Sequence, residues 1–280
     1  MDLPAGWLTD LAVLRGSGAR ITDLGDHLLI VSPDNPGYHW GNFLLVTDPC
    51  TRAHAARWVG QFRAAFPDAE HLCIGLPEEP EAGPWSAAGL MVSGDQVLSA
   101  AALPAQRPVP AGYDIRVLAS SADWAGAAQA DVAENLRTAE QPVAGFATFT
   151  AARWATRRAM SEAGAAAFVG AFRGPDCVAN LGIVLCGPDA QGREVARYQS
   201  VLTDAEHRGR GLAGHLIGVA ARWAQARGAR RWVIVTESDN QAGRLYRSLG
   251  FRPDATTWQA ERITGPAARR ATPGPVGSGG

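Results

Sequence analysis

The sequence predicts an α+β protein whose mixed, mostly antiparallel sheet is flanked by helices, with two such units in tandem. Three observations predict this class. The C-terminal half reads as strand, two helices, three antiparallel strands, helix, strand, helix, strand. The N-terminal half repeats part of that order more weakly. A Pro- and Gly-rich stretch, ALPAQRPVPAG at 102–112, separates the halves, and a length of 280 residues favours two domains.

The elements of the C-terminal half follow from periodicity and from turn residues. Short apolar runs bounded by turn residues predict strands at 113–118, 165–173, 177–187, 195–204, 230–238 and 255–263. Helical periodicity predicts helices at 121–136, 150–162, 212–228 and 240–250. The stretch GPDAQGRE at 187–194 is typical of a hairpin turn between two of the strands.

The N-terminal half contains three segments that echo the C-terminal half in the same order. FLLVTDP resembles SVLTDA, EHLCIGL resembles RRWVIVT, and WSAAGL resembles YRSLGF; these pairs start at 43 and 200, at 70 and 230, and at 85 and 246. In the N-terminal copy, PCTRAHAARW at 49–58 contains no glycine, whereas the C-terminal copy has a glycine-rich loop at the same place. We therefore expect a degenerate or scaffolding domain at 1–103, a linker at 104–112, a main domain at 113–264 and a disordered tail at 265–280.

Composition excludes several classes of protein. The 26 basic residues balance 27 acidic ones, so we expect no nucleic-acid partner. The sequence contains no lysine, which excludes a Walker P-loop and a lysine Schiff base. Four scattered cysteines lack metal-site spacing, so no metal is expected. No signal peptide or apolar run of about 20 residues is evident, so we expect a soluble, cytoplasmic protein without a membrane segment.

The stretch EHRGRGLAGHLI at 206–217 contains a G-x-G-x-x-G pattern through Gly209, Gly211 and Gly214. This pattern is typical of a dinucleotide-binding turn, which would make the protein an NAD-linked oxidoreductase. However, the acidic loop TDAEHR separates the preceding strand from the first glycine, and too few residues follow for a doubly wound sheet. The oxidoreductase is therefore a remote alternative.

A different family matches the same loop better. The run 208–213, Arg-Gly-Arg-Gly-Leu-Ala, is similar to the loop that binds the CoA pyrophosphate in the GNAT superfamily of acyl-CoA-dependent N-acyltransferases. Farther along, NQAGRLYRSLGF at 240–251 resembles a second motif of that family. The resemblance covers about 113–262, and it implies the GNAT fold and acetyl-CoA as co-substrate.

The resemblance also assigns roles to individual residues. Backbone N–H groups at a helix N-terminus stabilise phosphate, and glycine permits the dihedrals that such a loop needs. Tyr246 would protonate the departing thiolate. The residues implied to hold the cofactor are Val201, Leu202 and Thr203 for the pantetheine arm, Arg208, Gly209, Arg210, Gly211, Leu212 and Ala213 for the pyrophosphate, and Asn240 beside the pantetheine.

The general base is less clearly marked. Glu237 ends a predicted strand beside the expected cleft and is the candidate; Glu194 and a chain of water molecules are alternatives. A backbone N–H near Leu202 would bind the oxyanion, so no side chain is needed for that role.

Together these features predict an enzyme that moves an acetyl or other short acyl group from CoA to a primary amine by direct attack in a ternary complex. The acceptor would be a small-molecule amine or a peptide amine, and the protein a monomer or a homodimer. The aromatic stretch at 32–43 favours a contribution of the N-terminal unit to acceptor binding. A non-catalytic acyl-CoA-binding regulatory module is the alternative.

Overall fold

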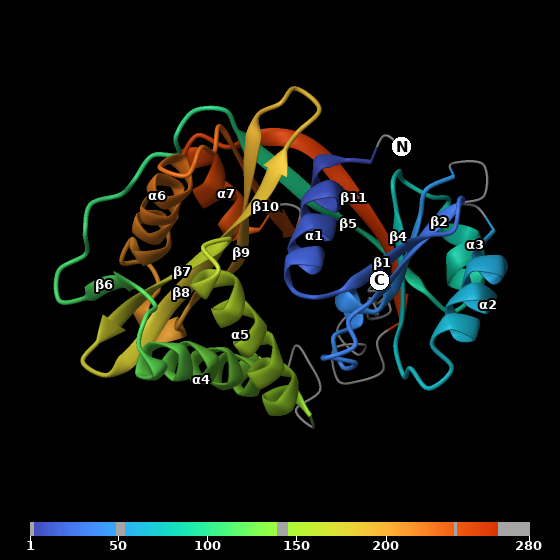
Figure 1. Ribbon diagram of the computed structural model, residues 1–280, viewed down its shortest axis with the longest axis horizontal. Coiled ribbons are helices and arrows are strands. Elements are labelled where there is room, and N and C mark those ends of the chain that lie inside the picture. Colours follow the sequence, from blue (N-terminus) through green and yellow to red (C-terminus); the bar gives the residue numbers. More distant parts are fainter. Residues whose placement is uncertain (1–2, 49–53, 139–144, 238–239, 263–280) are drawn as a thin grey trace, which may run out of the picture.

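The computed structural model describes residues 3–48, 54–138, 145–237 and 240–262. Within them, eleven strands form one sheet in the order β1-β2-β3-β4-β11-β5-β10-β9-β8-β7-β6, and helices cover both faces (Figure 1). The tail predicted at 265–280 lies outside the described residues, as does 49–53 in the segment compared with the glycine loop. No helix among the described residues is long and apolar enough to cross a membrane.

Most neighbouring strands of the sheet run antiparallel, and two neighbouring pairs, β3 with β4 and β9 with β10, run parallel. This confirms the predicted fold class. The strands are β1 (Arg20–Asp23), β2 (His27–Val31), β3 (Phe43–Val46), β4 (Leu72–Leu76), β5 (Met91–Ala100), β6 (Asp114–Val117), β7 (Ala166–Arg173), β8 (Asp176–Pro188), β9 (Glu194–Thr203), β10 (Arg231–Glu237) and β11 (Arg252–Arg262).

Helices connect the strands on both sides of the sheet. They are α1 (Ala5–Gly16), α2 (Ala55–Ala65), α3 (Ala82–Ala87), α4 (Ser121–Thr138), α5 (Phe146–Glu162), α6 (Leu212–Gln225) and α7 (Gln241–Ser248), with short 3-10 turns η1 (His39–Gly41) and η3 (Ala205–His207). α5 begins four residues before the helix predicted at 150–162, because Gly145 starts it in a left-handed conformation.

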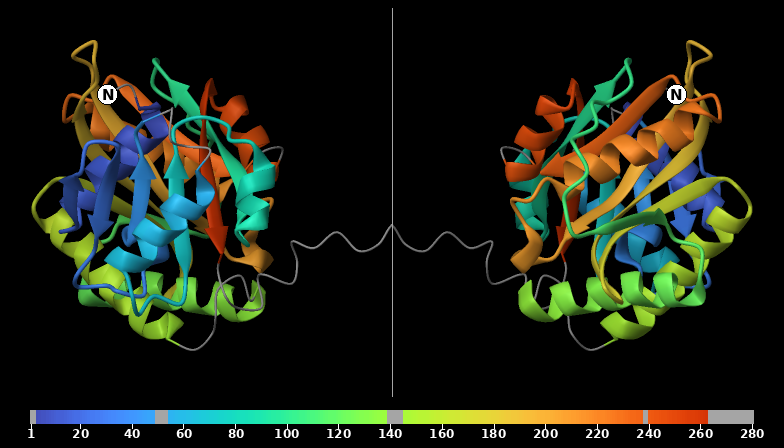
Figure 2. Two further views of the ribbon diagram at one scale, coloured as in Figure 1. Left: turned by 90° about the vertical axis from the view of Figure 1, so that its right-hand side faces the viewer. Right: turned by 90° about the vertical axis from the view of Figure 1, so that its left-hand side faces the viewer.

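The two halves repeat one topology, which confirms the echo in the sequence. In each half a strand pairs in parallel with the next strand along the chain through a helical crossover: β3, α2 and β4 in the first half, and β9, α6 and β10 in the second. A further helix and a long strand follow in both halves, α3 and β5 in the first and α7 and β11 in the second. Figure 2 views the two halves from opposite ends, with α2 and α3 facing the viewer in the left panel and α6 in the right.

The halves exchange their last strands. β11 ends the second half but lies between β4 and β5, and β5 ends the first half but lies between β11 and β10. Each of these long strands therefore pairs with the crossover strand of the other half. Because antiparallel pairing runs through this exchange without a break, the two halves share one sheet.

Alternating residues of β7 show how the sheet separates two cores. Ala167, Val169 and Ala171 pack with α6 and α7, while Ala166 and Phe168 pack on the opposite face with α4 and α5. This period of two is the expected geometry of a strand buried on both faces. α1 packs across β8, β9, β10 and β11, so a helix of the N-terminal half covers strands of the other half.

The segment between the two halves lies along α6. Ala105 N donates to Leu249 O at 2.9 Å, and the ring nitrogen Nδ1 of buried His215 lies 2.8 Å from Arg107 O. Small residues on α6 make room for it, because a Cβ on Gly214 would approach Arg107 Cγ to 2.6 Å and one on Gly218 would approach Gln106 Cβ to 2.3 Å. Gly214, the third glycine of the G-x-G-x-x-G pattern, is thus explained by packing.

Candidate active site

The parallel strands β9 and β10 separate after a short paired region. Their register covers only Val195–Arg197 against Arg231–Val233. Beyond it, β9 continues to Thr203 with β8 as its partner, and β10 continues to Glu237 with β5 as its partner. The facing edges of β9 and β10 therefore lack ladder partners there, and their backbone groups can bind a ligand.

A β-bulge lies in the separated part of β9. Asn180 pairs with Leu202 and Gly182 with Gln199, so two residues of β9 oppose one residue of β8. Ser200 is one of the two β9 residues in the bulge. Its φ of 47° is the single positive value among the described non-glycine residues. The bulge bends β9 within the region that no longer pairs with β10, three residues beyond Arg197.

The glycine loop leads from β9 into α6. Asp204 caps η3 by accepting from Glu206 N, and the chain then passes through Gly209 with φ 73° and Gly211 with φ 83°. Gly211 is the N-cap of α6, so the first N–H groups of this 14-residue helix point out of its end without intrahelical partners. Such an end stabilises negative charge.

The two arginines of the loop differ in their surroundings. Arg208 donates to Thr203 O at 3.0 Å and forms an ion pair with Glu134 at 2.7 Å, so it ties the loop to α4. The neighbouring Arg137 first, and then other groups including Arg208, keep the pKa of Glu134 low. Arg210 is exposed and donates to Glu206 O at 3.2 Å. Arg210 therefore keeps its charge available at the mouth of the loop.

α7 carries the second motif. Asn240 caps this helix, since its Oδ1 accepts from Gly243 N at 2.8 Å and from Thr236 Oγ1 at 3.0 Å. Tyr246 is buried, and its ring lies 6.3 Å from the ring of Phe251. Burial raises the pKa of Tyr246 to about 12, so its hydroxyl is protonated at neutral pH.

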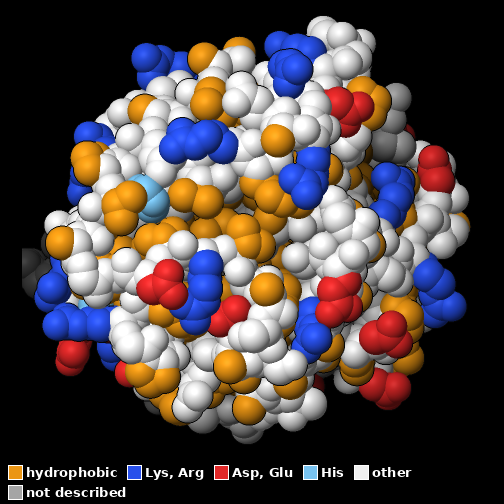
Figure 3. Space-filling model, turned by 60° about the vertical axis from the view of Figure 1, so that its left-hand side comes forward, with side chains coloured by type: hydrophobic (Ala, Val, Ile, Leu, Met, Phe, Trp, Pro, Cys, Tyr) orange, Lys and Arg blue, Asp and Glu red, His pale blue; other side chains and the backbone are white. Residues whose placement is uncertain are grey.

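One large cleft, with a volume of about 1360 Å³, joins these parts. On the face shown in Figure 3, hydrophobic side chains gather in a hollow and arginine side chains stand around it. Both halves of the chain line the cleft. Lining residues from the second half include Ser200 to Thr203, Arg208 to Gly214, Leu245 and Tyr246, and those from the first half include Tyr38, His39, Trp40 and Glu70.

The cleft brings together most residues that the sequence assigned to the site. Val201, Leu202, Thr203, the run from Arg208 to Ala213, and Tyr246 all line it. Asn240 is not among the lining residues and instead caps the helix that carries Tyr246. Glu237 is exposed, does not line the cleft, and lies opposite Asp95 of β5. Burial first, and then the charge of Glu237, raise the pKa of Asp95.

Sequence reasoning missed a group of residues on α5. Phe146, Phe149 and Arg153 line the cleft at intervals of three and four residues, which places them on one face of the helix. This spacing is visible in the sequence, but Phe146 and Phe149 precede the helix predicted at 150–162. The stretch at 32–43, expected to contribute to acceptor binding, does supply Tyr38 and Trp40 to the wall of the cleft.

Two titratable groups from distant parts of the chain line the wall near Trp40. His39 stacks on buried His71 with ring centroids 4.4 Å apart; burial first, and then His71, lower the pKa of His39 to about 4. Glu261 of β11 has a buried Oε2 without a hydrogen-bond partner among the described residues. Burial raises the pKa of Glu261. The first-half end of the cleft thus holds a neutral imidazole and a carboxyl group.

The fold and the cleft define an α+β protein with a glycine-capped helix N-terminus beside two separated strands. Residues 132–251 match the model of the Acetyltransferase (GNAT) family. The structure is similar to a GCN5-related N-acetyltransferase from Kribbella flavida, with 19% identity, a TM-score of 0.64, and coverage of 96% of this chain and 99% of that one. No curated protein matches the chain.

Two further solved structures share this architecture. A conserved protein of unknown function from Staphylococcus epidermidis has 13% identity and a TM-score of 0.61, with 86% of this chain and 92% of that one covered. A tandem GNAT protein from the clavulanic acid biosynthesis pathway has 16% identity and a TM-score of 0.51, with 89% and 79% covered. The match to the family model lies within the C-terminal half of the chain, and the likeness in fold to these solved structures extends over both halves.

Proposed function

We propose that the protein is an N-acyltransferase that moves an acetyl or other short acyl group from CoA to a primary amine in a ternary complex. The observation that carries this proposal is the arrangement around one cleft: a glycine loop at a helix N-terminus, a bulged strand with unpaired backbone groups, and a buried tyrosine. Domain boundaries at 1–103, 104–112 and 113–264 remain part of the proposal, with the first unit forming one wall of the acceptor site.

The pyrophosphate of CoA would bind at the glycine loop. The run from Arg208 to Ala213 leads into the N-terminus of α6, and Arg210 is exposed within that run. Because Arg208 is paired with Glu134, we assign it to holding the loop in place and assign phosphate contact to Arg210. Backbone donors at a helix end need no rearrangement to bind the anion.

The pantetheine arm would lie between β9 and β10 against Val201 to Thr203, with Asn240 at its edge. In this position an N–H near Leu202 can donate to the oxygen of the tetrahedral intermediate. Tyr246 would then give its proton to the departing thiolate, and a protonated hydroxyl at neutral pH is the form that this step needs.

Glu237 is retained as the proposed base, acting through water because it does not line the cleft. Its position supports this role, since it ends β10 beyond the residues that pair with β9. In a Glu237→Gln variant kcat should fall while acetyl-CoA affinity is retained, because the proposed base is lost and the cofactor contacts are kept.

The central experiment is a screen of amines with acetyl-CoA that follows release of the free CoA thiol, on the wild type and on Tyr246→Phe. Loss of the proton donor should lower kcat by about 100-fold with little change in acetyl-CoA affinity. Tyr198→Phe is the matched control, because that buried hydroxyl donates to Ile217 O at 2.9 Å within the core. It should lower stability and leave kcat close to the wild-type value.

The two alternatives give different results. A regulatory module would bind acetyl-CoA and transfer nothing, and Tyr246→Phe would then have no kinetic effect. An NAD-linked oxidoreductase would bind NADH tightly in calorimetry and show no affinity for CoA. Either result would overturn the transferase assignment.

A further inference from the structure

Arg153 and Arg157 lie one turn apart on α5 and share one carboxylate. Arg153 Nη2 lies 2.8 Å from Asp131 Oδ2, and Arg157 Nη1 lies 3.5 Å from the same oxygen. Trp154 Nε1 also donates to this oxygen at 2.9 Å. Within the part of the chain that the structure describes, neither arginine forms another ion pair. Two positive charges therefore face one negative charge.

Burial makes this excess charge significant. Arg157 is 8% exposed, and burial together with the neighbouring Arg153 lowers its pKa to about 9. The Nε of Arg153 is buried and has no hydrogen-bond partner among the described residues. An unbalanced charge in a protein interior is unfavourable, so a ligand that brings a negative charge would be stabilised here.

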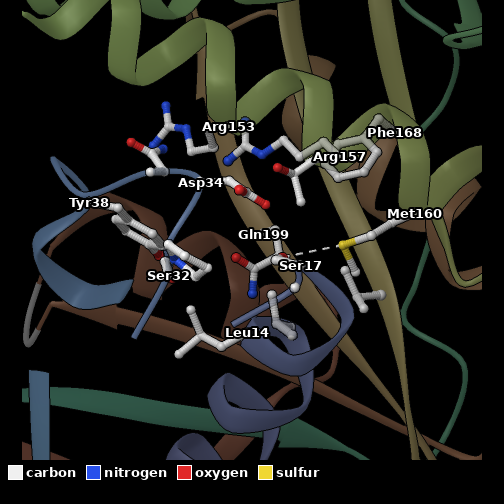
Figure 4. Close-up of a pocket in the computed structure, with 16 residues that line it drawn as sticks. Leu14, Ser17, Ser32, Asp34, Tyr38, Arg153, Arg157, Met160, Phe168 and Gln199 are labelled. Atoms are coloured by element: carbon white, nitrogen blue, oxygen red, sulfur yellow. Dashed lines mark hydrogen bonds between the residues drawn. The ribbon is translucent and has the colours of Figure 1, made fainter. Parts of the chain in front are cut away.

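Arg153 is open to two spaces. It lines the large cleft, and it also lines a second cavity of about 60 Å³. Figure 4 shows Arg153 and Arg157 side by side at this second cavity. Asp34 lines the small cavity as well, and the ion pairs that the two arginines form among the described residues are both with Asp131. Arg153 therefore borders the cleft, and its side chain is 25% exposed.

The position of Arg153 fits the geometry of transfer. Arg157 bonds to Ser200 Oγ in the bulge of β9 and, through Asp131, is linked to Arg153. Arg153 thus lies a short chain of polar contacts away from the backbone groups near Leu202. Arg153 and Ser200 to Leu202 line the same cleft, so a ligand that binds its carboxylate to Arg153 lies in the space that these backbone groups also border.

Aromatic side chains surround the same place. The guanidinium carbon of Arg153 lies 4.7 Å from the centre of the Phe149 ring. The Phe149 ring in turn contacts the ring of Phe146, at 5.6 Å between centroids, and the ring of Tyr38, at 5.7 Å. All three rings line the cleft. They form an apolar wall that suits an aliphatic or aromatic side chain next to the carboxylate.

We propose that the acceptor is a free amino acid with an apolar side chain, and that Arg153 binds its carboxylate. This inference rests on the proposed function and names the acceptor class of that site. A guanidinium group can donate two parallel hydrogen bonds to a carboxylate, and such charge-assisted pairs are stronger than neutral hydrogen bonds.

The reaction balances with this acceptor. The amine nitrogen forms a bond to the acetyl carbon, and the C–S bond breaks with its electron pair going to sulfur. The ammonium loses two protons: one passes to Tyr246 to replace the proton that it gave to the thiolate, and one passes to solvent. The carboxylate on Arg153 is unchanged.

The test compares acceptors that differ only by the carboxylate, using acetyl-CoA as donor: L-phenylalanine with 2-phenylethylamine, and L-leucine with 3-methylbutylamine. We expect wild-type kcat/KM to favour each amino acid by at least about 10-fold. In Arg153→Met this preference should fall to within about threefold, because the amino acid loses its anchor and the amine does not. Arg158→Met is the control, since Arg158 is on the same helix but is partly exposed, does not line the cleft and pairs with Glu162 at 2.8 Å.

The ratio of kcat/KM for the amino acid to kcat/KM for its matching amine is measured within each variant. A smaller folded fraction lowers both values equally and leaves the ratio unchanged. Equal or better use of the simple amines by the wild type would overturn the amino-acid proposal, as would a preference that survives in Arg153→Met; in both cases the transferase assignment would stand. Absence of acetyl transfer to every amine tested would instead overturn the proposed function on which this inference rests.

Discussion

Arg157 donates a hydrogen bond to the Oγ of Ser200, the residue with positive φ in the bulge of β9. A left-handed conformation costs a non-glycine residue about 1–2 kcal/mol, so it persists only where other contacts hold it. Arg157 is buried and reaches Ser200 from α5. The helix that carries the proposed acceptor site therefore also stabilises the bulge that opens the cleft.

This relationship predicts a rescue. Arg157→Met should lower kcat by about 10-fold, because the bulge loses the contact that holds Ser200. Glycine adopts positive φ without strain, so Ser200→Gly in the same chain should restore most of the lost activity. The measurement is steady-state kinetics of the two single variants and the double variant.

Ser200→Ala is the comparison for that experiment, because alanine loses the hydrogen bond and keeps the strain. The kcat of Ser200→Ala should resemble that of Arg157→Met and should be lower than that of Ser200→Gly. If the double variant is no more active than Arg157→Met alone, Arg157 does not act through the conformation of Ser200.

The parts of the site that the sequence predicted are those formed by consecutive residues. The loop from Arg208 to Ala213 and the helix of Tyr246 each depend on one short segment, whose glycines and cap are visible in the chain. Local patterns also placed the strands of the second half. Such features need no knowledge of distant contacts.

The parts that were missed depend on contacts between distant segments. The exchange of β5 and β11 could not be predicted, because the pattern of a strand does not specify its neighbour. The first turn of α5 was missed since FATF, at 146–149, is rich in residues that favour strands. The pairing of Arg153 with Asp131 joins two helices and has no local signal.

The glycine loop gives a prediction for cofactor affinity. Gly211 has φ 83° and open space around its Cα, so Gly211→Ala should strain the loop without a clash. The Kd for acetyl-CoA should rise by about 10-fold, because the N–H groups at the end of α6 lose their orientation. Calorimetric titration of the folded variant with acetyl-CoA checks this.

Gly192→Ala is the matched control for that substitution. Gly192 has φ 74°, also with open space, and lies in the turn between β8 and β9. It should lose about 1–2 kcal/mol of stability and keep wild-type affinity. Equal affinity of both variants for acetyl-CoA would show that the loop is not part of the acetyl-CoA binding site.

The small residues of α6 give a prediction for stability. Gly218→Ala brings a Cβ to 2.7 Å from the Cα of Gln106, so backbone between the two halves must move. We expect a loss of about 1–3 kcal/mol in the free energy of unfolding, measured by denaturant titration. Gly60→Ala, in α2, has nothing within 4 Å and should instead gain about 0.5–1 kcal/mol from helix propensity. A gain in both variants would show that the segment around Gln106 does not press on α6.

The stacked histidines give a prediction for the pH dependence of stability. The pKa of His39 falls from an ordinary 6.5 to about 4 on folding, so between these values the unfolded chain binds more protons than the folded one. The stability that this group contributes is present above pH 6.5 and is lost as the pH falls toward 4. After allowing for partial exposure, the wild type should lose about 2 kcal/mol more than His39→Phe over that range, since phenylalanine keeps the stacking and does not titrate.

Urea denaturation at a series of pH values measures the difference, with His54→Phe, at an exposed position, as the control. Parallel curves for wild type and His39→Phe would mean that burial of His39 does not oppose its protonation.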